Sequence, residues 1–272
     1  MTARRLTRGA LIGSALLTAT FLLLPVMVII PMSFSDSSML QFPPQQWSLR
    51  WYENFFTSPT WIESAWVSLR VALLVTVSSV VLGTLAALGL VRGRLPFRSL
   101  LTALVLAPII VPYVIIGLAV YAVSLQLGLT ETTVGFVAVH TALAVPYVAI
   151  NVAAALFGFD RRLELAAMNL GAGPVTTFFR ITLPLIAPSM LAGALFAFVI
   201  SWDEVVTSIF LSGPQMTTLP VRMWSGVRVS VDPTVAAISS LLLLMTLTMF
   251  TVAGVARLVR RRRARPSVQE EA

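Results

Sequence analysis

Six long apolar blocks alternate with shorter polar segments along the 272-residue chain. The blocks cover residues 11–30, 67–91, 100–123, 134–157, 187–211 and 235–259. About 20 apolar residues in a helix cross the ~30 Å hydrocarbon layer of a bilayer, so each block is long enough to span it. Because lipid offers no water to backbone amides and carbonyls, such segments must be helical. The pattern therefore predicts an all-α polytopic membrane protein, with six transmembrane helices in a single domain covering residues 1–272.

The arginines predict which connections face the cytoplasm. They gather before the first block, between the second and third, between the fourth and fifth, and after the sixth. The members of these groups are Arg4, Arg5, Arg8, Arg92, Arg94, Arg98, Arg161, Arg162, Arg180, Arg257, Arg260, Arg261, Arg262, Arg263 and Arg265. By the positive-inside rule, both termini and the connecting loop 158–185 are cytoplasmic. The basic tail, 257–272, is expected to anchor on anionic lipid.

Composition excludes several other classes of protein. Hydrophobic residues make up 57% of the chain and charged residues 11%, which leaves too little polar surface for a soluble domain of this size. The net charge of +8 follows the predicted topology, so we expect no nucleic-acid partner. The chain has no cysteine, no lysine and one histidine, His140. These absences exclude thiolate and multi-histidine metal sites within the chain. They also exclude a P-loop nucleotide site, because a P-loop needs a lysine to contact the phosphates. We therefore expect no cofactor and no enzymatic activity, and any ATP must be bound by another polypeptide.

One polar stretch between the fourth and fifth blocks, residues 161–184, has the composition of a compact folded element. Apolar Leu163, Ala166, Ala167 and Leu170 recur at helical spacing and predict one apolar stripe on a short helix. Gly171 suits the left-handed end of that helix, and Pro174 suits the first turn of a second one. We call residues 161–184 the docking element, because its exposed stripe needs a partner.

The docking element carries a recognisable spacing. Ala166-Ala167, three residues, Gly171, nine residues and Ile181-x-Leu183-Pro184 resemble the EAA loop of permeases in binding-protein-dependent ABC importers. The glutamate of that motif would fall at Leu165, whereas this chain has Glu164 one residue earlier. The resemblance implies a type I importer permease fold in a bacterial inner membrane. It also implies a coupling loop that docks in a groove of the cytoplasmic ATPase, formed by Leu163, Glu164, Ala166, Ala167, Leu170, Gly171, Ala172, Pro174, Ile181, Leu183 and Pro184.

The fifth block contains the candidate substrate residues Trp202, Asp203 and Glu204. A charged residue near the bilayer centre costs about 2.5 kcal/mol or more, so these acids need a purpose or a partner. One interpretation is a cation-attracting site on the translocation path, with the Trp202 ring available for cation–π contact. The alternative is a structural ion pair or a subunit contact. The candidate partners for an ion pair are Arg70, Arg222 and Arg228.

The sequence around these acids resembles one branch of the family. The run 198–224, which includes Gly213-Pro214 and Thr218-Leu-Pro-Val221, is similar to the second permease of spermidine/putrescine importers. This resemblance implies polyamine import together with two ATPase copies, a second homologous permease and an extracytoplasmic substrate-binding protein. Related permeases for ferric iron, thiamine or sulfate share the EAA loop and remain alternatives, as does, less well, an ion-driven secondary transporter.

Four smaller predictions concern local structure. Pro108, Pro112 and Pro146 should kink the third and fourth spans. Residues 49–56 of the aromatic outer loop should form a short helix, with contact to a binding protein as an alternative to a simple aromatic belt. His140 should be a hydrogen-bonded packing residue, and Glu131 should be solvated in an outer loop.

Overall fold

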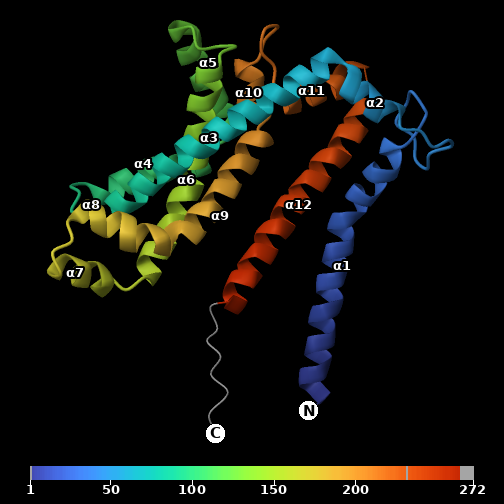
Figure 1. Cartoon of the computed structure of the whole chain (residues 1–272). Helices are drawn as coiled ribbons and strands as arrows, with labels where there is room; N and C mark the ends of the chain where they lie inside the picture. The colour runs from blue at the N-terminus through green and yellow to red at the C-terminus, as the bar shows by residue number, and fades with distance from the viewer. Residues whose placement is uncertain (1, 231, 264–272) are drawn as a thin grey trace. The chain divides into compact units, whose positions relative to one another are not determined.

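The computed structural model describes residues 2–230 and 232–263, and every regular element in these ranges is helical. The helices are α1 (Thr2–Ser33), α2 (Arg50–Thr57), α3 (Pro59–Arg92), α4 (Arg98–Ile110), α5 (Tyr113–Leu127), α6 (Thr133–Gly158), α7 (Arg162–Asn169), α8 (Pro174–Thr177), the π-helical turn η1 (Phe178–Thr182), α9 (Leu183–Trp202), α10 (Val206–Leu211), α11 (Leu219–Ser225), the π-helical turn η2 (Gly226–Ser230) and α12 (Thr234–Arg263) (Figure 1). The all-α prediction is confirmed. Residues 264–272 of the predicted basic tail lie outside the described residues.

The chain forms two compact units, Met1–Pro59 with Ser225–Ala272, and Thr60–Trp224. In the first unit α1 and α12 lie side by side, with the N-terminal end of α1 and the C-terminal end of α12 at the same end (Figure 1). The Tyr52 hydroxyl of α2 shares 2.7 Å hydrogen bonds with Ser33 of α1 and Ser240 of α12. Asn54 donates from Nδ2 to Thr234 Oγ1 at 2.8 Å. The predicted short helix in the outer loop is therefore confirmed as α2, and it joins the other two helices through hydrogen bonds.

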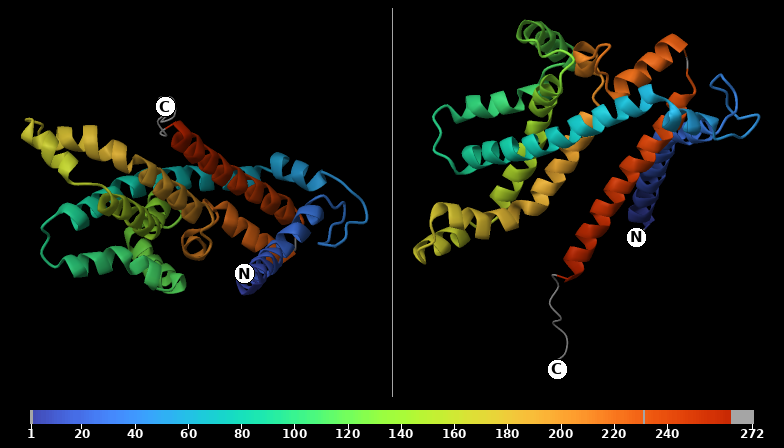
Figure 2. Two further views of the ribbon diagram at one scale, coloured as in Figure 1. Left: turned by 90° about the horizontal axis from the view of Figure 1, so that it is seen from below. Right: turned by 45° about the horizontal axis from the view of Figure 1, so that its top comes forward.

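In the second unit α6 packs along α9, and α3 approaches α6 closely at Gly83. Helices α6 and α9 lie against each other (Figure 2), and Val148 of α6 fills the space between two glycines. A Cβ atom added at Gly83 of α3 would meet the Val148 Cβ at 2.6 Å, and one added at Gly193 of α9 would meet the Val148 Cα at 3.0 Å. Small residues thus let the helix backbones approach closely. In lipid the hydrophobic effect does not drive helices together, so close van der Waals packing of this kind favours their association.

Two of the predicted spans are interrupted. The block 100–123 is not one straight helix, because α4 and α5 meet at an angle of 104°. Val111 is extended and Pro112 is the N-cap residue of α5, as expected where a proline disfavours helical geometry in the residue before it. Pro108 and Pro146 instead lie inside α4 and α6, whose helices continue through them. The kink predicted at Pro112 is thus a full break.

The block 187–211 also differs from a continuous helix. Helix α9 begins at Leu183, within the docking element, and ends at Trp202, and α10 begins at Val206. The polar pair Asp203-Glu204 therefore lies in a helix break rather than within a helix.

Most of the predicted spans correspond to long apolar helices in the structure. Within the described residues, four helices are long and apolar enough to cross a bilayer, and the bent α4–α5 pair would be a fifth. A shorter apolar helical stretch, Thr234–Met249, lies in the sixth predicted block. The protein is a multi-pass membrane protein, and the number of six spans stays a prediction.

Candidate docking element and acidic helix break

The docking element folds as two short helices joined by a tight turn. Gly171 has a φ of +92°, and its amide donates to the Met168 carbonyl at 3.0 Å while Ala172 donates to the Ala167 carbonyl at 3.0 Å. This pair of bonds is the Schellman arrangement, which satisfies the last carbonyls of a helix and favours glycine at the left-handed position. Pro174 then starts α8, where its missing amide hydrogen costs nothing. The helix–glycine–helix prediction is confirmed, and the element lies at the opposite end of the α6–α9 pair from α5 and α10 (Figure 1).

The docking element exposes a set of large apolar side chains. Leu163 of the predicted stripe is 50% exposed and Leu170, just after α7, is 90% exposed. The exposed large apolar side chains of the element are Leu163, Leu165, Met168, Leu170, Val175 and Phe179. Leu165, at the position where the EAA motif has its glutamate, thus adds to the apolar surface. Large exposed apolar side chains on a short polar loop are typical of protein-binding surfaces.

Glu164 is bound instead by other residues of its own chain. One carboxylate oxygen accepts a 2.7 Å hydrogen bond from the Thr182 hydroxyl, and the other lies 3.6 Å from Nε of Arg92. The sequence predicts only that Arg92 lies on the cytoplasmic side, and it gives no indication of a role for Thr182. Neither contact has a local sequence signal, because the three residues are far apart along the chain.

The acidic pair behaves differently from the simple helical prediction. Glu204 is only 6% exposed, and its Oε1 accepts a 2.7 Å hydrogen bond from the Thr207 amide in the first turn of α10. A carboxylate at this place satisfies an otherwise free amide and is favoured by the helix dipole. Asp203 is exposed at the end of α9. Trp202 stacks on Phe198 at 5.6 Å, so one face of its ring is already covered.

In the part of the chain that the structure describes, neither Arg70 nor Arg222 forms an ion pair with these acids. The two ion pairs found among the described residues join Arg50 to Asp36 and Arg92 to Glu164. Arg222 instead donates from Nε to the Ser64 hydroxyl at 2.8 Å. Glu204 obtains its donor from backbone, which a search of the sequence for cationic partners could not reveal.

His140 connects the two sides of the helix break. The ring is 1% exposed, with Nδ1 at 2.9 Å from the Ser201 hydroxyl of α9 and Nε2 at 3.0 Å from the Ser208 hydroxyl of α10. The prediction of a hydrogen-bonded packing role is confirmed. Ser201 and Ser208 lie on either side of the break at residues 203–205. The imidazole therefore helps to fix the position of α10 relative to α9.

Glu131 is not the solvated residue that the sequence predicted. Its Oε2 accepts a 2.8 Å hydrogen bond from the Gln215 amide, and its own amide donates to the Leu211 carbonyl at 2.9 Å. The carboxylate lies against Gly213, where a Cβ atom would clash with it. The loop before α6 is thereby joined to the Gly213-Pro214 loop after α10, and a side chain at position 213 would require the Glu131 carboxylate to move.

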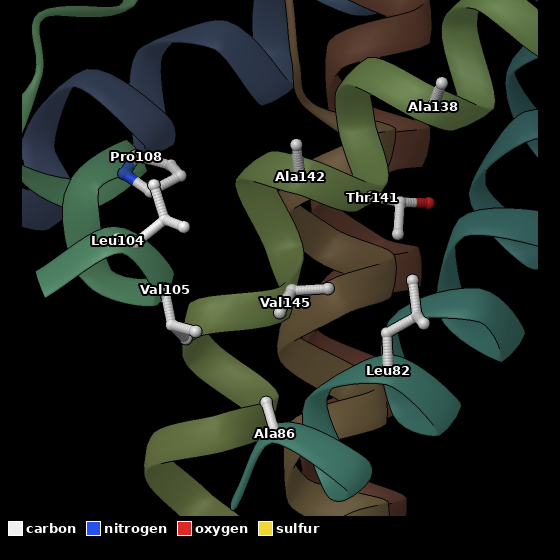
Figure 3. Close-up of a pocket in the computed structure, with 9 residues that line it drawn as sticks. All are labelled: Leu82, Ala86, Leu104, Val105, Pro108, Ala138, Thr141, Ala142 and Val145. Carbon is white, nitrogen blue, oxygen red and sulfur yellow. The ribbon is translucent and has the colours of Figure 1, made fainter. Parts of the chain in front are cut away.

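A groove of about 440 Å³ lies between α3, α4 and α6 (Figure 3). It is lined by Leu82, Ala86, Leu104, Val105, Pro108, Ala138, Thr141, Ala142 and Val145. The Thr141 hydroxyl is already within 2.6 Å of the Ser78 hydroxyl. The groove offers no charged group to a cation, and neither candidate acid lines it. In the described part of the chain, no cluster of three or more histidine or acidic residues is placed to hold a metal ion.

Comparison with known proteins identifies the family of the chain. Residues 79–264 match the family described as the binding-protein-dependent transport system inner membrane component. The chain belongs to that family. The permease is 35% identical over 238 residues to the putrescine transport system permease protein PotI of Escherichia coli (strain K12), covering 84% of this chain and 83% of the relative. It is 30% identical over 230 residues to the spermidine/putrescine transport system permease protein PotC of Haemophilus influenzae, covering 84% and 89%.

Solved structures support the same fold. A bacterial ABC transporter involved in the import of the acidic polysaccharide alginate has a chain that superposes with a TM-score of 0.70 at 15% identity, covering 96% of the permease and 99% of that chain. An amino acid ABC transporter matches with a TM-score of 0.58 at 18% identity, covering 78% and 98%. The expected importer-permease fold is confirmed. The family is a membrane-embedded transport component, so ATP hydrolysis belongs to a separate subunit.

Proposed function

We propose that the permease is the membrane subunit of an ATP-driven importer that carries polyamines such as putrescine or spermidine into the cytoplasm of a bacterial cell. The observation that carries this proposal is the likeness to PotI and PotC over more than four-fifths of each chain. The alginate and amino acid transporters share only the fold, so they do not argue for their own substrates here.

The docking element is proposed to receive the force of ATP binding and hydrolysis. Its exposed apolar side chains would seat in a groove of a cytoplasmic ATPase dimer, and the arginines favour a cytoplasmic position for it and for both termini. The Schellman turn and the short helices make the element stiff enough to pass on a rigid-body displacement to α6 and α9, which flank it.

The helix break is proposed to contribute to the substrate path. Backbone that leaves helical geometry at membrane depth is tolerated where it is buried in protein or lines a water-filled cavity. Glu204 is buried and caps α10, whereas Asp203 is exposed and has more access to a passing cation. Asp203 is therefore our candidate for the acid that attracts a polyammonium substrate, with Trp202 beside it.

The remaining subunits follow from the same proposal. A second homologous permease would complete the transmembrane pathway, and a substrate-binding protein outside the membrane would deliver the polyamine. The alginate transporter has also been solved with a periplasmic protein bound to an alginate pentasaccharide, which shows this kind of partner on a related fold. Lipid surrounds the exposed apolar helix faces.

The test is transport by the complete assembly in proteoliposomes. We expect ATP-dependent uptake of labelled putrescine or spermidine that requires the binding protein. Asp203→Asn should slow uptake while the assembly still forms, and Glu63→Gln, at an exposed acid on α3, is the matched control. Competition with thiamine, sulfate and ferric iron separates the alternative solutes.

Two results would contradict the proposal. Uptake that is blocked by one of the other solutes but not by polyamine would reassign the substrate. Uptake driven by an ion gradient in vesicles that contain no ATPase would identify a secondary transporter instead.

A further inference from the structure

One side chain connects three helices at the docking end of the second unit. Arg92 is the last residue of α3, and its Nε lies 3.6 Å from Oε2 of Glu164 on α7. Its terminal amino group donates to the Leu156 carbonyl of α6 at 3.4 Å. The guanidinium also lies 5.1 Å from the centre of the Phe159 ring, directly after α6. The fork of an arginine can make such contacts in several directions at once, which a lysine cannot.

Glu164 extends this connection to a fourth element. Its other oxygen accepts the hydroxyl hydrogen of Thr182, a buried residue at the end of η1 where α9 begins. The Glu164 and Arg92 side chains are only 13% and 21% exposed, so water screens the pair weakly. The carboxylate therefore has one protein partner on each side, and α7 is held from both.

Covalent connectivity alone would leave α3 out of the docking element. The chain leads directly from α6 into α7 and from η1 into α9, whereas α3 ends at Arg92 and the chain continues into α4. The Arg92–Glu164 pair is thus a direct contact through which a displacement of α7 reaches α3. Helix α3 also touches α6 where Gly83 meets Val148, so α3 has a second contact with the helix that leads into α7.

We propose that Arg92 is a positioning residue that joins α3 to the docking element, so that ATP-driven movement of α7 is passed to α3 as well as to α6 and α9. This inference rests on the proposed ATP-driven function and adds a third helix to the moving set. In this proposal Glu164 makes the internal contact with Arg92, and the exposed apolar side chains, Leu165 included, contact the ATPase.

A simpler interpretation is that Arg92 only marks the cytoplasmic side of the membrane. Arg94 offers a matched control, because it lies two residues away in the same connection and is exposed. If charge near the membrane were all that mattered, Arg92→Ala and Arg94→Ala would have equal effects.

The main experiment measures coupling in the complete assembly in proteoliposomes. For each variant we would measure ATP hydrolysis, ATPase co-purification and polyamine uptake. Arg92→Ala should keep the ATPase bound and hydrolysing, while uptake per ATP hydrolysed falls roughly two- to thirty-fold, the effect typical of residues that carry coupling. Arg94→Ala should leave uptake per ATP unchanged. The exchanged pair, Arg92→Glu with Glu164→Arg, should recover part of the loss seen in either single variant.

A second measurement does not depend on ATP. Hydrogen exchange of the full chain in detergent should show faster exchange of the α7 amides in Arg92→Ala than in Arg94→Ala. Arg92→Lys, which keeps the charge but not the fork, should lie between wild type and Arg92→Ala, and it serves if Arg92→Ala does not fold.

The outcomes separate the inference from the function on which it rests. Equal uptake per ATP in the Arg92→Ala and Arg94→Ala assemblies would overturn the inference, as would α7 exchange that is unchanged by Arg92→Ala. A wild-type assembly without any ATP-driven uptake would instead refute the proposed function, and the exchange comparison would still decide whether Arg92 holds α7.

Discussion

Replacement of Gly171 by alanine tests the geometry of the docking element most directly. Gly171 has a φ of +92°, and a Cβ atom at this position would have nothing within 4 Å. Any effect must therefore come from backbone conformation and not from a clash. Left-handed geometry costs an L-residue roughly 1–2 kcal/mol.

The expected magnitude follows from that difference. A local destabilisation of about 1–2 kcal/mol changes the ratio of open to closed turn by a factor of roughly 5–30. The amides that report this opening are those of residue 171 and Ala172, whose acceptors are the Met168 and Ala167 carbonyls. Both amides should exchange with solvent faster by the same factor, while amides in the middle of α6 stay unchanged.

Gly173 supplies a matched control within the same turn. Its φ is −68°, which any residue adopts, and a Cβ atom there would also have nothing within 4 Å. Gly173→Ala should change exchange by less than about twofold, since no strained conformation is involved. Equal effects of the two alanine substitutions would refute the reasoning. If the turn must be formed before docking, Gly171→Ala should also weaken ATPase binding, and Gly171→Pro should abolish it.

Three further predictions concern the membrane-embedded part. Gly83→Ala should lower stability by about 1–3 kcal/mol through overpacking against Val148, seen as a lower melting temperature in detergent. Gly89→Ala is its control, because the nearest atom to an added Cβ is Leu95 Cδ1 at 3.5 Å. Glu204→Gln keeps an acceptor for the Thr207 amide, so it should be more stable than Glu204→Ala by about 1 kcal/mol; equal melting would argue against the capping role. His140→Ala leaves two buried serine hydroxyls without the ring and should cost about 1–3 kcal/mol, and an unchanged melting temperature would show that the network contributes nothing.

Much of the fold could be predicted because lipid imposes strong local rules. Apolar length predicts the spanning helices, and the glycine and proline of the docking element predict its turn and second helix. These are properties of a few adjacent residues, so a single sequence contains them. Pro112 was identified as a site of bending for the same reason, although the size of the bend depends on how α4 and α5 pack.

The contacts between distant segments could not be predicted in this way. Glu164 and Thr182 are separated by a turn whose exact path decides whether they meet, and Arg92 comes from another helix altogether. Glu131 looked like an ordinary loop residue because its partner, the Gln215 amide, is backbone and therefore has no signal in the side-chain sequence. The hydroxyl partners of His140 lie in two different helices.

The acidic pair shows why polarity in a membrane segment does not by itself reveal a binding residue. From sequence alone, Asp203 and Glu204 are two charges in a predicted helix that need not share a role, and either one could line the pathway or contact a neighbouring subunit. A helix break provides another kind of partner, because the first amides of α10 have no acceptor within the helix. Glu204 accepts a hydrogen bond from one of these amides. One acid can therefore be stabilised by the break itself, and it also favours the break by capping the new helix. Among the described residues, no backbone amide donates a hydrogen bond to the Asp203 carboxylate. The electrostatic argument for substrate attraction therefore applies to Asp203 with more force than to Glu204. Uptake by the Asp203→Asn and Glu204→Gln variants tests this difference between the two acids. Asp203→Asn should slow transport more strongly than Glu204→Gln, and the reverse order would mean that the buried acid, not the exposed one, meets the substrate.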